Sequence, residues 1–328
     1  MKTGCIKKLL ITTAAVFLAG YGVHAQITPP PLSLASSPAA PSPGQQVTIQ
    51  AATPTFDKDA AFFEWTVDGE PRPDFSGQGK NTITVTAGEL GSVMRVSVRV
   101  VRAGGGAEVS LQIRAADLSL TWSAETIAPK WYKGKALPTS GSIVDIAAIP
   151  GFIIDGQTIK PDALIYRWTL DDQTNALVGL GKQVFRIKTS DLPQTSHQIE
   201  VVVEDPDKKI RKTGRMFVVP TTPRAVIYPF TPLGGIESRT TNQTIGQRRG
   251  LSDFAAEPFF FPVASKQNLA WVWDIGGTPA QSSASGASMI TIDTTNQPQG
   301  TLPISVRVEY AKSLIPQSAS KILNLFLQ

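Results

Sequence analysis

Three copies of one short motif recur in this chain at nearly equal spacing. The motif is an aromatic residue, a variable residue and a tryptophan, and it occurs at Phe63-Glu-Trp65, Tyr166-Arg-Trp168 and Trp271-Val-Trp273. The tryptophans lie 103 and 105 residues apart, and a glycine follows them after 14, 13 and 13 residues. Self-similarity at a fixed period is typical of tandem structural units, so the sequence predicts three copies of one module.

Each copy continues with two runs of alternating apolar and polar residues. The first run starts four residues after the glycine, and the second is centred 33 residues after the tryptophan. Alternation with period two, rich in β-branched residues, indicates half-buried antiparallel strands. We therefore expect each tryptophan to lie at the centre of a core and to face the middle of the second run. The predicted core residues are Trp65, Trp168, Trp273, Val98, Val201 and Val306.

Composition agrees with short strands and turns rather than long helices. The 328 residues include 27 Gly and 25 Pro, and only 17% of them are charged. About seven short strands in roughly 100 residues, with one early tryptophan, indicate a β-sandwich. The predicted fold is all-β, with three tandem antiparallel β-sandwiches. The predicted segments are a signal peptide at 1–25, a Pro/Ser/Ala-rich lead-in at 26–43, and sandwiches at 44–115, 116–220 and 221–328.

The motif in the third copy resembles a known family. Trp271-Val-Trp-Asp-Ile-Gly-Gly277 is similar to the Tyr-x-Trp-Asp-Phe-Gly-Asp-Gly signature of PKD-type immunoglobulin-like modules, and residues 41–49 resemble the first strands of that family. The resemblance implies extracellular spacer, adhesion or surface-display modules that usually lack catalysis.

The N-terminus carries the features of an export signal. Lys2, Lys7 and Lys8 precede an apolar stretch at residues 9–23, and Val23-His24-Ala25 forms a small-residue cleavage site. We expect a secreted or cell-surface protein; an uncleaved N-terminal anchor is the alternative, and the only route to a membrane. The single cysteine, Cys5, lies in this segment, so cleavage leaves no thiol for a disulfide or a Cys/His zinc site. The net charge of +5 includes the three lysines, so it does not indicate nucleic-acid binding.

Residues for catalysis are scarce. The only histidine after the predicted signal is His197, and no Gly-x-Ser-x-Gly elbow accompanies it. We therefore expect no enzyme, no catalytic residue and no cofactor. Three acidic turns, at Asp57-Lys-Asp59, Asp171-Asp172 and Glu204-Asp-Pro-Asp207, fit ordinary polar turns better than a calcium site, which takes six to eight oxygen ligands.

Two further groups are candidates for binding a polymer. A basic cluster follows the last acidic turn, where a hairpin tip could contact anionic wall polymer or DNA phosphates; a solvated hairpin is the alternative. Aromatic residues outside the strand pattern, Trp122, Trp131 and Tyr132, could stack on sugars, as could residues 259–261, which also fit an apolar strand entering the core. The candidate polymer-binding residues are Lys208, Lys209, Arg211, Lys212, Arg215 and Trp131.

The connections between copies predict a rod. Residues 112–120 run from strand to strand without Gly or Pro, which indicates a short, stiff joint, and Pro220 and Pro223 favour an extended, semi-rigid second joint. The leading hypothesis is a non-enzymatic surface or extracellular protein that spaces or displays modules and contacts other proteins. The alternative is a module that binds carbohydrate or an anionic polymer.

Overall fold

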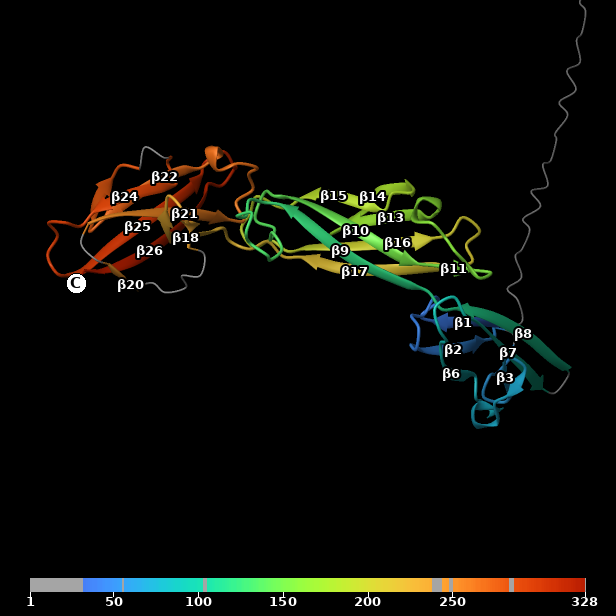
Figure 1. The fold of residues 1–328 in the computed structure, drawn as a ribbon. Helices are drawn as coiled ribbons and strands as arrows, with labels where there is room; N and C mark the ends of the chain where they lie inside the picture. Colours follow the sequence, from blue (N-terminus) through green and yellow to red (C-terminus); the bar gives the residue numbers. More distant parts are fainter. Residues whose placement is uncertain are drawn as a thin grey trace, which may run out of the picture.

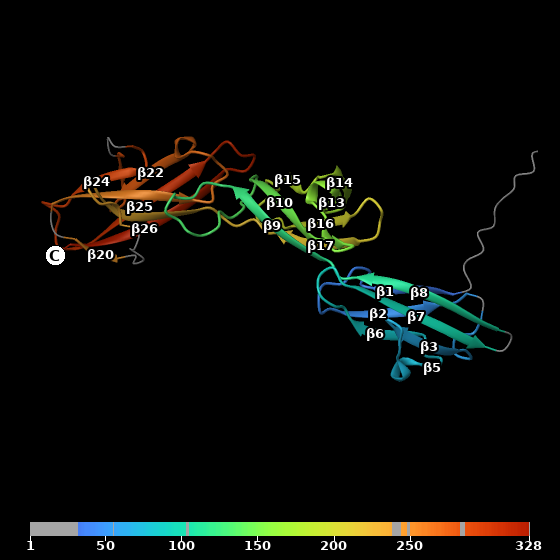
Figure 2. The ribbon, with the colours of Figure 1, turned by 45° about the vertical axis from the view of Figure 1, so that its right-hand side comes forward.

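The computed structural model describes residues 32–327, apart from residues 55, 103–104, 238–243, 248–249 and 283–285. The predicted signal peptide and residues 26–31 lie outside this range. Three β-sandwich modules follow one another along an elongated molecule: module 1 (32–115), module 2 (116–220) and module 3 (221–327). Modules 2 and 3 lie nearly in line, and module 1 is turned away from them (Figure 1 and Figure 2).

Module 1 contains one sheet of order β1-β2-β6 and a second of order β4-β3-β7-β8, with β5 added beside β3. Its elements are β1 (Ser33–Ser37), β2 (Gln46–Ala52), β3 (Phe62–Val67), β4 (Glu70–Pro71), the 3-10 helix η1 (Pro73–Phe75), β5 (Gly77–Gln78), β6 (Thr82–Thr86), β7 (Val93–Arg102) and β8 (Gly105–Arg114).

Module 2 repeats this arrangement with sheets of order β15-β10-β9 and β14-β13-β16-β17, plus a small β11-β12 hairpin. Its elements are β9 (Asp117–Glu125), β10 (Ile143–Gly151), β11 (Ile153–Ile154), β12 (Gln157–Thr158), the 3-10 helix η2 (Pro161–Ala163), β13 (Ile165–Leu170), β14 (Gln173–Leu180), β15 (Val184–Lys188), β16 (His197–Glu204) and β17 (Arg211–Val218).

Module 3 has sheets of order β19-β18-β21-β24 and β20-β26-β25-β22-β23, and β20 pairs with β26 in parallel. Its elements are β18 (Arg224–Thr231), β19 (Gly235–Ile236), β20 (Thr244–Gln247), β21 (Leu251–Phe259), the 3-10 helix η3 (Lys266–Asn268), β22 (Ala270–Ile275), β23 (Thr278–Ala280), β24 (Met289–Asp293), β25 (Gly300–Tyr310) and β26 (Gln317–Leu327).

The same strand order occurs in all three modules. The first, second and fifth principal strands form one sheet. In the other sheet, the tryptophan strand lies between the fourth strand and the last two strands. Two antiparallel sheets joined in this way form an immunoglobulin-like sandwich, with side chains from both inner faces making the core. The structure therefore confirms the predicted fold class of three tandem immunoglobulin-like sandwiches.

The predicted lead-in at 26–43 is wrong in part, because Ser33–Ser37 is strand β1. It pairs with β2 from Ser33↔Ala52 to Ser37↔Thr48. Its sequence, SLASS, lies at the sheet edge and is only partly buried. Small residues without β-branching give no alternating signal, so the sequence did not indicate a strand within the lead-in.

The three tryptophans occupy equivalent places in the three cores. Their exposed fractions are 1%, 0% and 1%, and their register partners are Val98, Val201 and Val306, all fully buried. Each indole N–H donates a hydrogen bond to a backbone carbonyl, at 2.9 Å to Lys80, 2.8 Å to Lys182 and 3.0 Å to Ala287. The buried polar atom of the largest core ring is thereby satisfied in every module.

This hydrogen bond explains the glycine that follows each tryptophan in the sequence. The accepting carbonyl belongs to the residue after that glycine, and the glycines have φ of +71°, +67° and +135° at positions 79, 181 and 286. Such backbone geometry is unfavourable for residues with a Cβ. At Gly181, an added Cβ would also lie 3.2 Å from the carbonyl oxygen of Asp162.

Replacing Gly181 by alanine is expected to lower the free energy of unfolding of module 2 by about 1–2 kcal/mol, the usual cost of a left-handed conformation. Gly156→Ala is a matched control, because Gly156 has φ of +79° but open space around its Cβ position. Urea unfolding followed by hydrogen exchange should show the larger loss for Gly181→Ala. Equal losses would show that contact with Asp162 plays no part.

Candidate functional site: the two joints between modules

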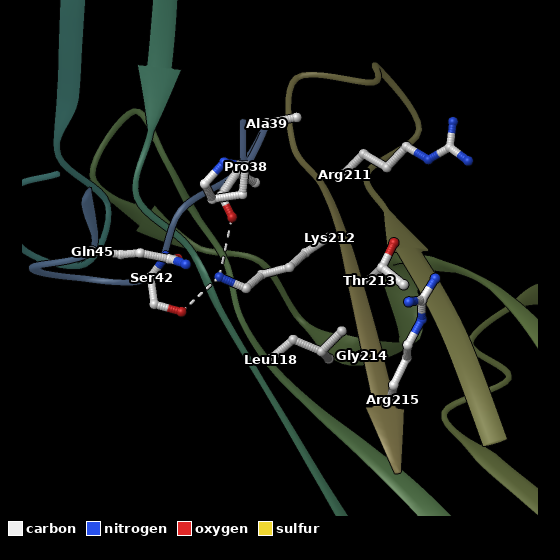
Figure 3. A pocket seen from close by; sticks show the side chains of 11 residues that line it. Pro38, Ala39, Ser42, Gln45, Leu118, Arg211, Lys212, Thr213, Gly214 and Arg215 are labelled. Carbon is white, nitrogen blue, oxygen red and sulfur yellow. Dashed lines mark hydrogen bonds between the residues drawn. The ribbon is translucent and has the colours of Figure 1, made fainter. Parts of the chain in front are cut away.

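A cavity of about 750 Å³ lies at joint 1, between modules 1 and 2. Strand β17 forms one side of it, the connection between β1 and β2 forms the opposite side, and Leu118 of β9 lies between them (Figure 3). Most of the predicted basic cluster lies on or beside this strand. The structure therefore places Arg211, Lys212 and Arg215 at joint 1, whereas Lys208 and Lys209 lie in the turn between β16 and β17.

Lys212 crosses the joint from β17 (Figure 3). Its Nζ donates to the carbonyl oxygen of Ala116 at 2.5 Å, to Ser42 Oγ at 2.9 Å and to the carbonyl oxygen of Ala40 at 3.1 Å. An ammonium group has three donors, so these three acceptors use all of them. Burial lowers the pKa of Lys212, and the nearby carboxylate of Asp117 opposes that shift.

Short backbone and apolar contacts accompany Lys212. The N–H of Ala116 donates to the carbonyl of Pro41 at 2.9 Å. Ile153 packs so closely on Gly91 that a Cβ there would lie 2.6 Å from the isoleucine Cβ. Only two residues separate β8 from β9, and both are buried alanines. Joint 1 is therefore a packed contact between the modules.

Joint 2, between modules 2 and 3, is closed by aromatic rings. The rings of Trp131 and Tyr132, from the connection between β9 and β10, meet rings of module 3 edge to face. Trp131 lies 5.4 Å from Tyr228 and 6.1 Å from Phe259, measured between ring centroids. Tyr132 lies 5.4 Å from Phe259 and 5.9 Å from Phe260. Edge-to-face pairs at these distances stabilise a contact beyond the area they bury.

Backbone hydrogen bonds fix the same connection to module 3. The N–H of Ile127 donates to the carbonyl of Phe261 at 2.9 Å, and the N–H of Phe260 donates back to the carbonyl of Ile127 at 2.6 Å. The side chain of Ile127 packs against the core of module 3. On the other side of the joint, Gln317 Nε2 donates to the carbonyl of Ser140 at 2.6 Å.

The predicted spacer at Pro220–Pro223 is hydrogen-bonded to the connection between β9 and β10. The N–H of Thr221 donates to the carbonyl of Pro138 at 2.7 Å, and Thr221 forms a parallel β-bridge with Thr139. The stretch is thus extended, as its prolines predict, but it lies alongside the connection from module 2. Sequence reasoning missed this role of residues 126–142, although Trp131 and Tyr132 already stood out from the strand pattern.

The structure divides the predicted basic cluster. Lys212 is not part of a free basic surface as expected, because strand alternation turns it toward module 1 and turns Arg211 and Arg215 to the opposite face. Arg215 forms an ion pair with Glu200 on β16. Lys209 lies 3.6 Å from Asp207 and 4.0 Å from Asp155. Arg211 and Lys208 are exposed.

Trp131 has an exposed fraction of 39%, and the remainder of its surface is covered at joint 2. Trp122 lies under Lys135, whose Nζ is 3.6 Å from the ring centroid. Phe261 is fully buried in the core of module 3, and Phe259 and Phe260 are nearly so. The aromatic residues considered for sugar stacking therefore contact one another, a lysine or a core, and do not share one open face.

Both ring nitrogens of His197 have fixed partners. The N–H of Ser190 donates to Nε2 at 2.8 Å, so Nδ1 carries the proton and donates to Asp171 Oδ2 at 2.8 Å. The other oxygen of Asp171 accepts the N–H of Gln198. This arrangement orients the turn before β16 and leaves neither nitrogen positioned to take a proton from a nucleophile.

Two of the three acidic turns are closed by their own side-chain hydrogen bonds. Asp57 Oδ1 accepts the N–H of Asp59 at 3.0 Å, and Asp205 Oδ1 accepts the N–H of Ile210. Among the residues that the structure describes, no three acidic or histidine side chains converge as metal ligands would. The sequence favours ordinary polar turns over a calcium site, and calcium titration of the molecule in solution tests that prediction.

No protein-family model and no curated protein matches this sequence. Solved structures do match. The three N-terminal domains of the highly immunogenic outer capsid protein of bacteriophage RB49 share 12% identity over 90% of this chain and 98% of that one, with a TM-score of 0.25. The central fibronectin-III array of RIM-binding protein shares 12% sequence identity over 88% of this chain and 98% of that one, with a TM-score of 0.30. Immunoglobulin domains 1–4 of Sidekick-1 share 12% sequence identity over 90% of this chain and 74% of that one, with a TM-score of 0.22.

These scores lie below 0.5, so the fold assignment rests on the strand pairing in the chain itself. The chain is a tandem array of immunoglobulin-like sandwiches. The narrower PKD resemblance remains a prediction. Within the described ranges, no helix has the length and apolar character needed to cross a bilayer.

Proposed function

We propose that this chain works outside the cell as a spacer or adhesion rod, without catalytic turnover, that holds three modules at fixed orientations and contacts other proteins. The observation that carries the proposal is that direct contacts join the modules at both joints. Lys212 makes hydrogen bonds across joint 1, and the aromatic rings around Trp131 pack against module 3 at joint 2. A flexible string of modules needs neither contact. A rod that must present its far module at a set distance and angle needs both.

The N-terminal segment supports the location. Its lysines, apolar run and small-residue site are typical of an export signal. The engaged nitrogens of His197 support a role without turnover. A hydrolytic activity that survives purification and is lost with one point substitution would overturn that part of the proposal.

Small-angle scattering on the full chain, with and without calcium, tests the rod. With each sandwich about 35–40 Å long, we expect a maximum dimension of about 100 Å or more. A radius of gyration near 19 Å, as for a compact globule of roughly 300 residues, would contradict the proposal. We expect the profile to be the same in calcium and in chelator. A profile that lengthens with calcium would instead assign the acidic turns as ligands.

A further inference from the structure

The cavity at joint 1 has the form of a groove beside one strand. Five consecutive residues of β17, Arg211 to Arg215, line it on one side. Pro38, Ala39 and Ala40, with Ser42 and Gln45, line the other side, and Leu118 lies at its base (Figure 3). A wall made of successive strand residues is a surface along which an extended chain can lie.

Strand β17 is the last strand of its sheet, whose order is β14-β13-β16-β17. In an antiparallel pair, alternate residues direct their N–H and C=O groups away from the partner strand. Within the described part of the chain, no backbone hydrogen bond joins β17 to β9 or to module 1. The outer edge of β17 therefore offers unpaired backbone donors and acceptors, which is what strand addition by a peptide uses.

The charge of this edge selects among occupants. Arg211 and Arg215 point outward from β17, with Arg215 in an ion pair with Glu200 of β16, and Lys208 and Lys209 lie just before the strand. A second copy of β17 paired with the first would bring like charges together across the strands, which is destabilising. An extended segment that carries carboxylates on one face would complement Arg211, and its next carboxylate would share the guanidinium of Arg215 with Glu200.

The opposite face of the groove calls for a different residue type. Lys212 already has three acceptors and offers no further donor, and its neighbours in the groove are Pro38, Ala39 and Leu118. Small apolar side chains of a bound peptide would pack against this wall, whereas a peptide carboxylate on this face would have no hydrogen-bond donor to pair with. The groove thus fits a strand in which acidic and small apolar residues alternate.

We propose that the edge of β17 binds an extended acidic peptide segment of a partner protein as an added strand, its carboxylates over Arg211 and Arg215 and its apolar residues toward Leu118. This goes beyond the rod proposal, which depends on shape alone. The two proposals can therefore be told apart: scattering can contradict the rod while the peptide still binds, and the peptide can fail to bind while scattering supports the rod. Cations on an edge strand can instead prevent any other strand from pairing with it. The experiment below distinguishes peptide binding from such a protected edge.

The probe is a fluorescent octapeptide of alternating Glu and Val, titrated into the full chain by anisotropy and followed by amide exchange. We expect saturable binding and new protection at alternate amides of β17. Two N-methylated forms of the peptide, each blocked on one of its two hydrogen-bonding edges, should differ in affinity. The form whose blocked edge faces β17 should not bind. Equal binding of both forms, or equal protection elsewhere in the chain, would overturn strand addition.

Variants test the charges. The double variant Arg211→Glu, Arg215→Glu should weaken peptide binding by about tenfold, since each cross-strand charge pair contributes modestly. Arg99→Glu, an exposed strand cation of module 1, is the matched control and should leave binding unchanged. If inorganic polyphosphate displaces the peptide and binds equally well, the surface attracts anions only and the proposal is wrong. Absence of any binding would show that the edge is blocked.

Discussion

Replacing Trp168 by alanine is expected to lower the free energy of unfolding of module 2 by about 3–5 kcal/mol. The ring is fully buried, lies 5.5 Å from the ring of Phe185 and donates its indole N–H to the carbonyl of Lys182. Alanine would leave a large cavity and remove the hydrogen bond to the carbonyl of Lys182. Because single domains are stable by only about 5–15 kcal/mol, module 2 would lose much of its stability.

The measurement should report each module separately, since every module has its own core tryptophan. Hydrogen exchange with peptide-level resolution during urea unfolding meets this need. Trp168→Phe should cost less, about 1–3 kcal/mol, because it keeps most of the packing and loses the hydrogen bond. Trp131→Ala, at a partly exposed position, serves as the control for module 2. A loss below about 1 kcal/mol for Trp168→Ala would show that the ring is not the centre of the core.

The core could be predicted because its residues recur at fixed distances along the chain. Trp65 and its counterparts, the valines opposite them and the glycines after them were all visible as repeats. What the repeat could not show is why the glycines are there. That reason is a hydrogen bond between the indole and a carbonyl, and it became visible only when the turn was placed over the ring.

The joints could not be predicted, because they depend on contacts between distant residues. Lys212 meets acceptors 96 and 172 positions away, at Ala116 and Ala40. Alternation shows that Lys212 and Arg211 face opposite sides of β17, but not which side meets module 1. In the same way, the sequence marked Trp131 as an aromatic residue outside the core pattern, and only the packing of module 3 shows what it contacts.

Lys212→Met is expected to loosen joint 1 and leave module 2 folded. Methionine has a similar length, so packing along β17 is largely kept, but three acceptors of module 1 and the joint lose their donor. Hydrogen bonds from a charged donor contribute about 1.5–3 kcal/mol when they form. Since burial already lowers the pKa of Lys212, removing the charge also removes a desolvation cost. We therefore expect a large change in orientation and a small change in the unfolding of module 2.

Distance distributions between spin labels measure that change. Cys5 is the single cysteine of the chain, so a Cys5→Ser background allows labels at exposed Glu64 of module 1 and Thr174 of module 2. The distribution should be narrow in this background and clearly broader with Lys212→Met. Lys209→Met, which removes a lysine paired only with exposed acids, is the matched control and should stay narrow. A distribution that is already broad in the unmodified joint, or unchanged by Lys212→Met, would mean that this lysine does not set the angle between the modules.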